Sequence, residues 1–458
     1  MPLLTALVRS APLLTLLIGL AHAQPDTTTV VPPAPEAGPR PVEDTTDAAA
    51  AAPAIILDGD AGVDYEEVPG DDRAGGRRRL RFSPIIMPSA LYSSSRGFGL
   101  GGGVQITGLT APDAALRLEA RVAERLQGIR ASYYTGDPMA RPVYGRLGMA
   151  ATTTSRYPFY GVGPRSRRES KLYLDHLSAE VEANVGWYPF RHTGLLLQPV
   201  ARFRFDRSRG YEAARDSALF YLDPASRAHI DSLQGTDRYG VAVGLEALSD
   251  TRDSEASPTR GYFVQGGATR FFATDGSGLG FQRFEVNAYG FTPALLHLRF
   301  LPERGALFVR ASGVVTRPDA GDDLPFFYQP TLDHEQIAGY PQSRFVGRDA
   351  VSLGLGARGT IFQAIGAILV EGMGMAMVGG AYNDVFEEFT PRVTLDPEPD
   401  LTGERIPLRP SVAFGVNFIY IDRDRPLLGA LVGFGPEGFV LASFRLIYDL
   451  RTYRPQAR

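Results

Sequence analysis

Few residues of this chain have the types and spacing that catalysis needs. No serine lies between glycines at positions −2 and +2, the arrangement of many hydrolase nucleophiles. Gly97, Gly99 and Gly102 spell a dinucleotide-binding fingerprint, but that fingerprint needs a following helix, and Val104–Ile106 reads as a strand. Metal-ligand spacing is absent from the six histidines, which are His22, His176, His192, His229, His297 and His334. We therefore expect no enzyme and no cofactor.

The charged residues instead follow a period of two. Arg117, Glu119 and Arg121 alternate with apolar residues of the segment 116–122, and the same pattern fills 177–187, 283–290 and 440–450. Successive side chains of a strand point to opposite faces, so each segment predicts a strand with one apolar and one charged face. The charged set comprises Arg117, Arg121, Glu180, Glu182, Arg202, Arg204, Arg283, Glu285, Arg310 and Arg445.

Two folds use this alternation. A soluble sandwich would bury the apolar faces, whereas a membrane barrel would turn them to lipid and the charged faces to its lumen. Strands of about 9–13 residues favour the barrel. We read sixteen strands between 82 and 450, and the four longest loops, 155–171, 208–237, 317–349 and 377–408, fall on one side. The sequence therefore predicts an all-β transmembrane antiparallel β-barrel of sixteen strands over 81–450.

The N-terminus predicts export. An apolar run from Ala11 to Ala21 ends in the small-x-small site Ala21-His22-Ala23, as in a secretory signal peptide over 1–23, although an uncleaved anchor is the alternative. Residues 24–80 are rich in proline and alanine and predict a disordered periplasmic spacer, and 451–458 form a C-terminal tail. We expect a bacterial outer-membrane location.

The segment Asp250-Thr251-Arg252-Asp253, followed by Pro258-Thr259-Arg260-Gly261, is similar to a periplasmic turn of the BamA/TamA family of outer-membrane barrels (the bacterial surface antigen superfamily). Leu324–Phe327 with Ile337–Tyr340 resembles its long sixth extracellular loop. The resemblance covers 82–450 and implies a role in protein assembly or translocation. Members usually carry POTRA modules before the barrel, and no such module fits in 24–80.

The resemblance also implies that the loop 317–349 folds back into the barrel. There the family places an Arg-Gly-Phe/Tyr motif against an acidic residue, but Ala338 precedes Gly339 and Tyr340 here. We hypothesise that Arg344 or Arg348, with Arg344 preferred, reaches Glu371 of the segment Leu369-Val370-Glu371. The alternative is a solvated loop, with Glu371 paired to a strand arginine such as Arg358.

Two functional classes remain open. The first is a transport or assembly component that contacts a periplasmic or client protein, and the second is a passive porin-like channel or a surface scaffold. The lumen charges could set ion selectivity or could simply pair with one another. Outer-membrane lipid and lipopolysaccharide are the expected surroundings. With 47 Lys and Arg residues against 51 Asp and Glu residues, the charge gives no reason to expect nucleic-acid binding.

Overall fold

The structure is a computed structural model. It describes the residues 84–93, 97–107, 109, 114–135, 143–164, 166–190, 194–209, 221–254, 257–293, 305–319, 323–332, 336–364, 368–396, 405–420 and 425–446. The predicted signal peptide (1–23), spacer (24–80) and tail (451–458) lie outside these residues.

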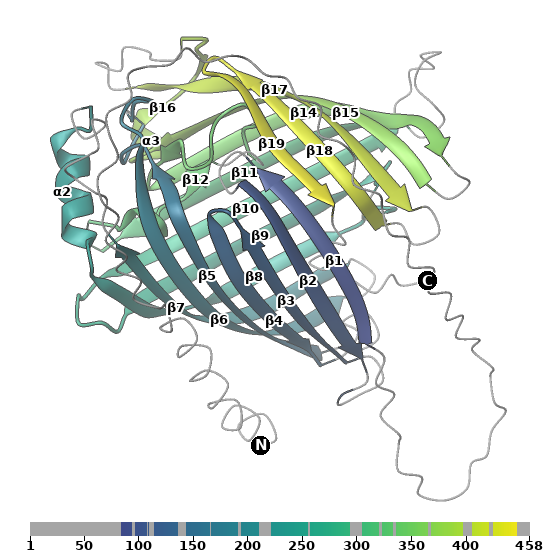
Figure 1. Ribbon diagram of the computed structural model, residues 1–458, viewed down its shortest axis with the longest axis horizontal. Helices are drawn as coiled ribbons and strands as arrows, with labels where there is room; N and C mark the ends of the chain where they lie inside the picture. Colours follow the sequence, from purple (N-terminus) through teal and green to yellow (C-terminus); the bar gives the residue numbers. More distant parts are fainter. Residues whose placement is uncertain are drawn as a thin grey trace, which may run out of the picture. The chain divides into compact units, whose positions relative to one another are not determined.

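Antiparallel strands build nearly all of the described chain (Figure 1). The strands of the main sheet that pair in sequence order are β1 (Pro84–Ser93), β2 (Gly97–Thr107), β3 (Ala115–Ala123), β4 (Leu126–Tyr134), β5 (Val143–Phe159), β6 (Leu172–Phe190), β7 (Leu195–Arg209), β8 (Asp237–Asp250), β9 (Gly261–Ala273), β10 (Gly280–Pro293), β11 (Ala306–Pro318), β14 (Asp349–Ala364), β15 (Ile368–Tyr382), β17 (Ile406–Tyr420), β18 (Arg425–Gly435) and β19 (Gly438–Leu446).

The sheet closes on itself. β1 pairs with β2 on one side and with β19 on the other, so these strands form a continuous ring of sixteen. The predicted all-β barrel and its strand number are therefore confirmed in the described residues. Three short strands lie outside the ring: β16 (Phe389–Val393) runs parallel to the start of β17, and β12 (Thr331–Leu332) pairs with β13 (Phe345–Val346).

The two faces of the ring have the predicted characters. On β3, the side chains of Leu118 and Val122 are 43% and 61% exposed, whereas the side chain of Arg117 on the same strand is only 4% exposed. An exposed band of large apolar side chains suits a wall that faces lipid, and the inward arginine suits a polar lumen. The alternation read in the sequence is thus the lipid-to-lumen alternation of the wall.

The long connections gather at one end of the ring, called here the outer end. The loop between β11 and β14 carries the 3₁₀ turn η3 (Phe326–Tyr328). Two other long connections carry α2 (Pro224–Leu233) and α3 (Val385–Glu388) (Figure 1). Asp223 caps α2 by accepting a hydrogen bond from Ser226 N at 2.9 Å, and Pro224 occupies its first turn. Within the described residues, no helix has the length and apolar character needed to cross a membrane.

Candidate functional site

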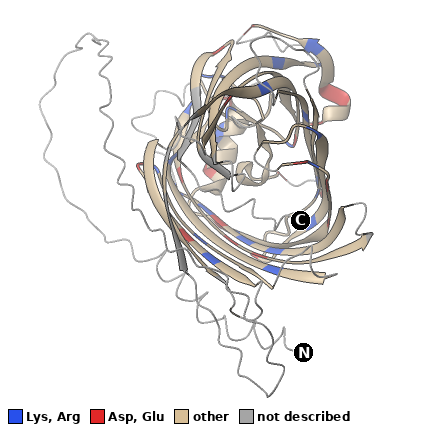
Figure 2. Cartoon of the chain, turned by 90° about the vertical axis from the view of Figure 1, so that its right-hand side faces the viewer, with Lys and Arg blue, Asp and Glu red and all other residues tan. Residues whose placement is uncertain are grey.

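The loop between β11 and β14, described at 323–332 and 336–348 and called here the plug loop, occupies the lumen and is the centre of the candidate site. Figure 2 looks into the ring and shows ribbon segments of the chain inside it. The first half of this plug loop carries a cluster of buried apolar side chains around η3, in which Leu324, Phe326 and Tyr328 are at most 2% exposed. Apolar burial inside a charged lumen places the loop as a folded plug, as the family resemblance implied.

Two lumen arginines hold this first half. Arg204 of β7 donates from Nη2 to the carbonyl oxygen of Phe327 at 2.8 Å, and its guanidinium lies 4.9 Å from the centre of the Tyr328 ring. Arg283 of β10 donates to the carbonyl oxygen of Tyr328. Both arginines belong to the charged set read from the sequence. In the structure these two arginines bind the backbone of the plug loop, a role that the alternation of charges does not indicate.

The second half of the plug loop presses on the wall near β18. Gly339 has φ +94°, and a Cβ there would lie 2.5 Å from the carbonyl carbon of Phe434, so only glycine fits. Tyr340 is 1% exposed and donates its hydroxyl to the carbonyl oxygen of Pro410 at 3.2 Å. The Gly339-Tyr340 pair from the sequence motif therefore packs directly against β17 and β18.

Arg344 forms a buried ion pair, but its partner is not the predicted one. Its Nε and Nη2 each lie 2.8 Å from Oε1 of Glu437, in the turn between β18 and β19, and the two side chains are 1% and 3% exposed. Nη1 also donates to the carbonyl oxygen and Oγ of Ser166, both at 2.9 Å. Arg168 donates to the Glu437 carbonyl oxygen at 2.7 Å. These residues form a clamp, the Arg344–Glu437 clamp, at the outer end.

The predicted pairing of Arg344 with Glu371 is therefore wrong. Glu371 lies near the start of β15, at the opposite end of that strand from the long loops, and accepts a hydrogen bond from Ser257 Oγ. Arg348 contributes its backbone carbonyl oxygen, which accepts from Thr316 N at 3.1 Å. The alternative of a solvated loop is also excluded by the burial of Arg344. Strand order placed the loop 317–349 at one end, but it did not give how deep the loop reaches or how far along its strand Glu371 lies.

The turn between β8 and β9 contains the second predicted motif. Arg252 Nε and Nη2 donate to the two carboxylate oxygens of Asp250, at 2.9 and 2.8 Å. Asp253 accepts from the backbone nitrogens of Thr259 and Arg260, at 2.8 and 3.2 Å. Partial burial acts to raise the pKa of the Asp253 carboxyl, but hydrogen bonds from the Thr259 hydroxyl and from these backbone nitrogens outweigh it and lower that pKa. The motif residues thus fold the turn on itself.

The same turn reaches across to other strands. Gly261 has φ +94°, and a Cβ there would lie 2.3 Å from the carbonyl oxygen of Thr251, so the turn closes tightly at its base. Beside Ser257, which donates to Glu371, the carbonyl oxygen of Pro258 accepts from Arg358 of β14. The β8–β9 turn therefore braces β14 and β15 at the end of the ring opposite the plug loop.

Several other lumen charges pair with each other. Arg202 lies 2.6 Å from Glu182, 3.2 Å from Glu180 and 3.9 Å from Glu246. Asp206 is fully buried, and its carboxylate oxygens lie 2.7 Å from Arg204 Nε and 3.1 Å from His176 Nε2. The Phe327 ring stacks on the His176 imidazole, and the two ring centres are 5.5 Å apart. This arrangement matches the reading in which opposite charges fill the lumen, and it makes His176 a satisfied polar residue.

Several site residues carried no signal in the sequence. Glu437 lies in a Pro-Glu-Gly turn that reads as an exposed hairpin tip, and Ser166 lies in a basic loop. His229 of α2 lies in a loop for which no helix was predicted, yet its Nε2 accepts from Phe326 N at 3.1 Å. Each acquires its role through contacts between distant segments. No group of His, Asp and Glu residues suited to a metal ion occurs in the described part of the chain.

Comparison with solved structures identifies the fold, whereas the sequence matches no protein-family model and no curated protein. BamA from Haemophilus ducreyi lacking POTRA domains 1–3 superposes with a TM-score of 0.55 at 11% identity, covering 80% of this chain and 69% of that one. CdiB from Escherichia coli superposes with a TM-score of 0.50 at 10% identity, covering 79% of this chain and 62% of that one. The predicted resemblance and the outer-membrane location are thereby supported at the level of architecture. This chain has the fold of the outer-membrane β-barrels represented by BamA and CdiB.

Proposed function

We propose that this barrel is a transport or assembly component of the outer membrane that works by controlled opening, and that it is not an enzyme. The observation that carries the proposal is the seam of the ring. β1 and β19, the first and last strands of the ring, pair at Ala90↔Leu446, Leu91↔Arg445 and Tyr92↔Phe444. Unlike the other neighbouring strands of the ring, they are not joined to each other by a loop, so the wall can part at the seam without moving a connection between the two strands.

The plug loop is tied to this seam. Glu437 belongs to the turn that joins β18 to β19, and β19 forms one side of the seam. The Arg344–Glu437 clamp therefore connects the plug loop directly to the hairpin beside the seam. Movement of the loop would release the hairpin, and movement of the hairpin would release the loop. Coupling of this kind suits a barrel that opens for a client protein, with membrane lipid and lipopolysaccharide around it.

The rival function is a passive porin-like channel or a surface scaffold. A passive channel needs a lumen that is continuously open and a wall that never parts. The Arg344–Glu437 clamp holds the plug loop within the ring, and so do Arg204 and Arg283, which donate to the backbone of η3. Both features favour controlled opening over a passive channel. The two functions differ in whether the seam must open, and that difference can be tested.

A disulfide across the seam tests whether the seam must open for function. The chain has no cysteine, so Leu91→Cys with Arg445→Cys introduces a single pair at facing positions. Facing residues of antiparallel strands lie about 4.5–5.5 Å apart between Cα atoms, within the range that a disulfide spans. Gln265→Cys with Asn287→Cys, at facing positions of β9 and β10, is the matched control.

Each variant is expressed in cells that lack the wild-type protein, and the outer-membrane proteome is measured by mass spectrometry. We expect the control and the wild type to restore it equally. The seam variant should fail when oxidised and recover when a reductant is added. Full restoration by the oxidised seam variant would support the passive channel or scaffold and overturn the proposal.

A further inference from the structure

One buried carboxylate joins the two ends of the plug loop. Asp349 is the first residue of β14, directly after the plug loop, and its side chain is fully buried. Near the end of β11, before the loop begins, Thr316 N donates to Asp349 Oδ1 at 3.0 Å, and Arg317 Nη1 donates to both carboxylate oxygens, at 2.8 and 2.9 Å. Thr316 N also donates to the carbonyl oxygen of Arg348 at 3.1 Å. Asp349 therefore fixes the two ends of the loop against each other.

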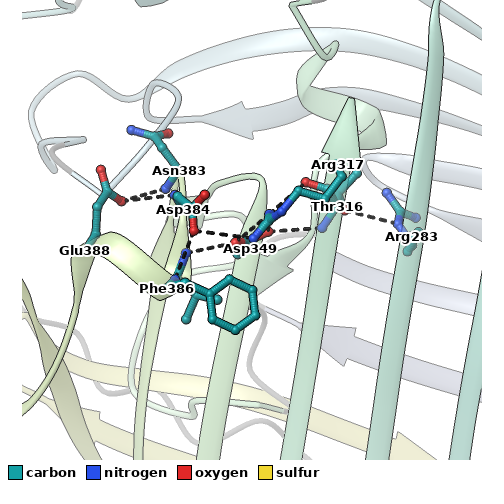
Figure 3. A network of polar contacts seen from close by, with 9 residues as sticks. Arg283, Thr316, Arg317, Asp349, Asn383, Asp384, Phe386 and Glu388 are labelled. Atoms are coloured by element: carbon teal, nitrogen blue, oxygen red, sulfur yellow. Dashed lines mark hydrogen bonds and ion pairs between the residues drawn. The ribbon is translucent and has the colours of Figure 1, made fainter. Parts of the chain in front are cut away.

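The same carboxylate binds a second loop (Figure 3). This loop, called here the arm, comprises 383–396, follows the end of β15 and includes α3 and β16. Val385 N donates to Asp349 Oδ2 at 2.8 Å, and Arg317 Nη2 donates to Asp384 Oδ1 at 3.3 Å. In Figure 3, Asp349 lies between Arg317 on one side and the labelled residues of the arm on the other. Asp349 is therefore an acceptor that the arm shares with the ends of the plug loop.

Local contacts hold the start of the arm against this acceptor. Asp384 caps α3 by accepting from Phe386 N at 2.9 Å, and Glu388 Oε2 accepts from Asn383 N at 2.7 Å. The Arg317 guanidinium lies 5.4 Å from the centre of the Phe386 ring. These contacts keep the first turn of the arm in one conformation, so its position follows that of the acceptor.

The rest of the arm lies at the outer surface. The side chains of Phe386 and Leu395 are exposed, and β16 pairs in parallel with the first residues of β17. The arm therefore connects an exposed surface at the outer end to a buried contact beside the plug loop.

The contacts around Asp349 continue into the plug loop. The Oγ1 of Thr316 accepts from Arg283 Nε at 3.5 Å, and Arg283 also donates to the carbonyl oxygen of Tyr328 in η3. A Cβ at Gly347 of the plug loop would lie 2.7 Å from the carbonyl oxygen of Tyr382, the last residue of β15 before the arm. The end of the plug loop and the start of the arm thus lie backbone against backbone, so a shift of one pushes on the other.

We propose that Asp349 is a latch that couples the arm to the plug loop, so that the two loosen and tighten together. A buried carboxylate that loses a donor is left with an unmet demand for hydrogen bonds, so the donors from the arm and from the loop ends stabilise one another through their shared acceptor. A displacement of the arm at the outer surface then reaches the plug loop, and the reverse also holds. This coupling is independent of the proposed opening of the seam.

Removing one N–H group separates the arm from the latch. Val385 is the first residue of α3, where proline is tolerated, and Asp384 before it has the extended backbone that a following proline requires (φ −144°, ψ 110°). Val385→Pro therefore removes the arm's donor to Asp349 without a change of charge. Val385→Ala, which keeps the N–H, is the matched control. A heat-dependent shift in gel mobility confirms that each variant has folded.

Hydrogen exchange of the protein in lipid nanodiscs measures the effect on the plug loop. The reporters are the amides of Arg344 and Gly347, which donate to carbonyl oxygens within the loop at 3.2 and 3.3 Å. Val385→Pro should speed their exchange by about 5- to 20-fold, the range of ordinary coupling free energies, whereas Val385→Ala should change it by less than about twofold. Unchanged exchange in Val385→Pro, or an equal increase in both variants, would overturn the latch.

The coupling must also act in the other direction, because coupling free energies are reciprocal. Arg344→Gln loosens the plug loop at the clamp, and the amide of Thr394, which donates to the carbonyl oxygen of Leu408 at 3.0 Å, reports the arm. Arg344→Gln should speed exchange at Thr394 when Val385 is present, but by less than about twofold when it is combined with Val385→Pro. Faster exchange in the plug loop of Arg344→Gln without any change in the arm would contradict the proposal.

Discussion

The Arg344–Glu437 clamp shows how one buried ion pair can connect two distant parts of the chain. Both side chains are withdrawn from water, and a charge left alone there is costly because the interior cannot replace its hydration. The hydrogen bonds from Arg344 to Ser166 satisfy the rest of the guanidinium. The pair therefore fixes the register of the plug loop against the β18–β19 hairpin.

We predict that Arg344→Gln and Glu437→Gln each destabilise the folded barrel by about 3–5 kcal/mol, because each leaves an unpaired buried charge. The double variant should lose less than the sum of the two losses. Urea titrations of the protein in lipid vesicles measure all three. Glu371→Gln combined with Arg344→Gln is the control and should be additive. Additive losses for the Arg344 and Glu437 pair would contradict the clamp.

Residue-level prediction from the sequence succeeded where a local pattern decides the outcome. Gly339 and Gly261 were singled out from motifs, and both have positive φ and close backbone contacts. The partner of Arg344 could not be predicted, because it depends on which distant turn lies beside the loop. Glu437 has the sequence of an ordinary hairpin tip, and only the closed ring brings it to Arg344.

At the scale of elements, strands were predicted well because each one carries its own alternation of apolar and polar residues. The alternating segments 177–187 and 283–290 lie within β6 and β10. β5 continues to Phe159, inside the predicted loop 155–171, since its last residues pack on the plug loop and not on lipid or lumen water. α2 and β16 have short or mixed patterns and were not foreseen.

The alternation makes a sharp prediction on β10. Val286, near the middle of the strand, is 47% exposed on the lipid-facing side, and the following residue, Asn287, points to the lumen. Val286→Arg should cost about 2–4 kcal/mol, the cost of a cation near the bilayer midplane, whereas Asn287→Arg should cost far less. Folding titrations into lipid vesicles compare them. A larger cost for Asn287→Arg would mean that the register is displaced by one residue.

The contact between α2 and η3 should depend on pH. Burial lowers the pKa of the His229 imidazole from its usual value of 6.5, against the attraction of Asp323, which is exposed to solvent. Nε2 must be unprotonated to accept from Phe326 N. The folded contact therefore holds fewer protons than the open one, so its stability is complete above pH 6.5 and falls as the pH falls below that value.

Hydrogen exchange at the Phe326 amide tests this. Protection in the wild type should decrease between pH 7.5 and pH 5 after correction for the intrinsic exchange rate. His229→Asn keeps an acceptor that does not titrate in this range and should show no such decrease. An equal decrease in both proteins would assign the pH dependence to another group.

At the scale of the whole molecule, the ring, the plug loop and the β8–β9 turn form one system. The plug loop is held at the outer end through Arg344 and Glu437, and the turn braces β14 and β15 at the other end through Ser257 and Glu371. The ring closes between β1 and β19, its first and last strands. Fold class, strand number and the inward loop could be predicted from sequence, but the clamp and the brace are long-range contacts that no single segment encodes.

The central claim is that the lumen is closed at rest and opens under control, and single-channel recording in planar bilayers tests it most directly. We predict that the wild-type barrel stays near zero conductance with brief openings, and that Arg344→Gln, which releases the plug loop from the hairpin, opens far more often. Asn287→Arg, a lumen change away from the clamp, should leave the closed level unchanged. A steady, ohmic conductance of the wild-type barrel that Arg344→Gln does not alter would contradict the account.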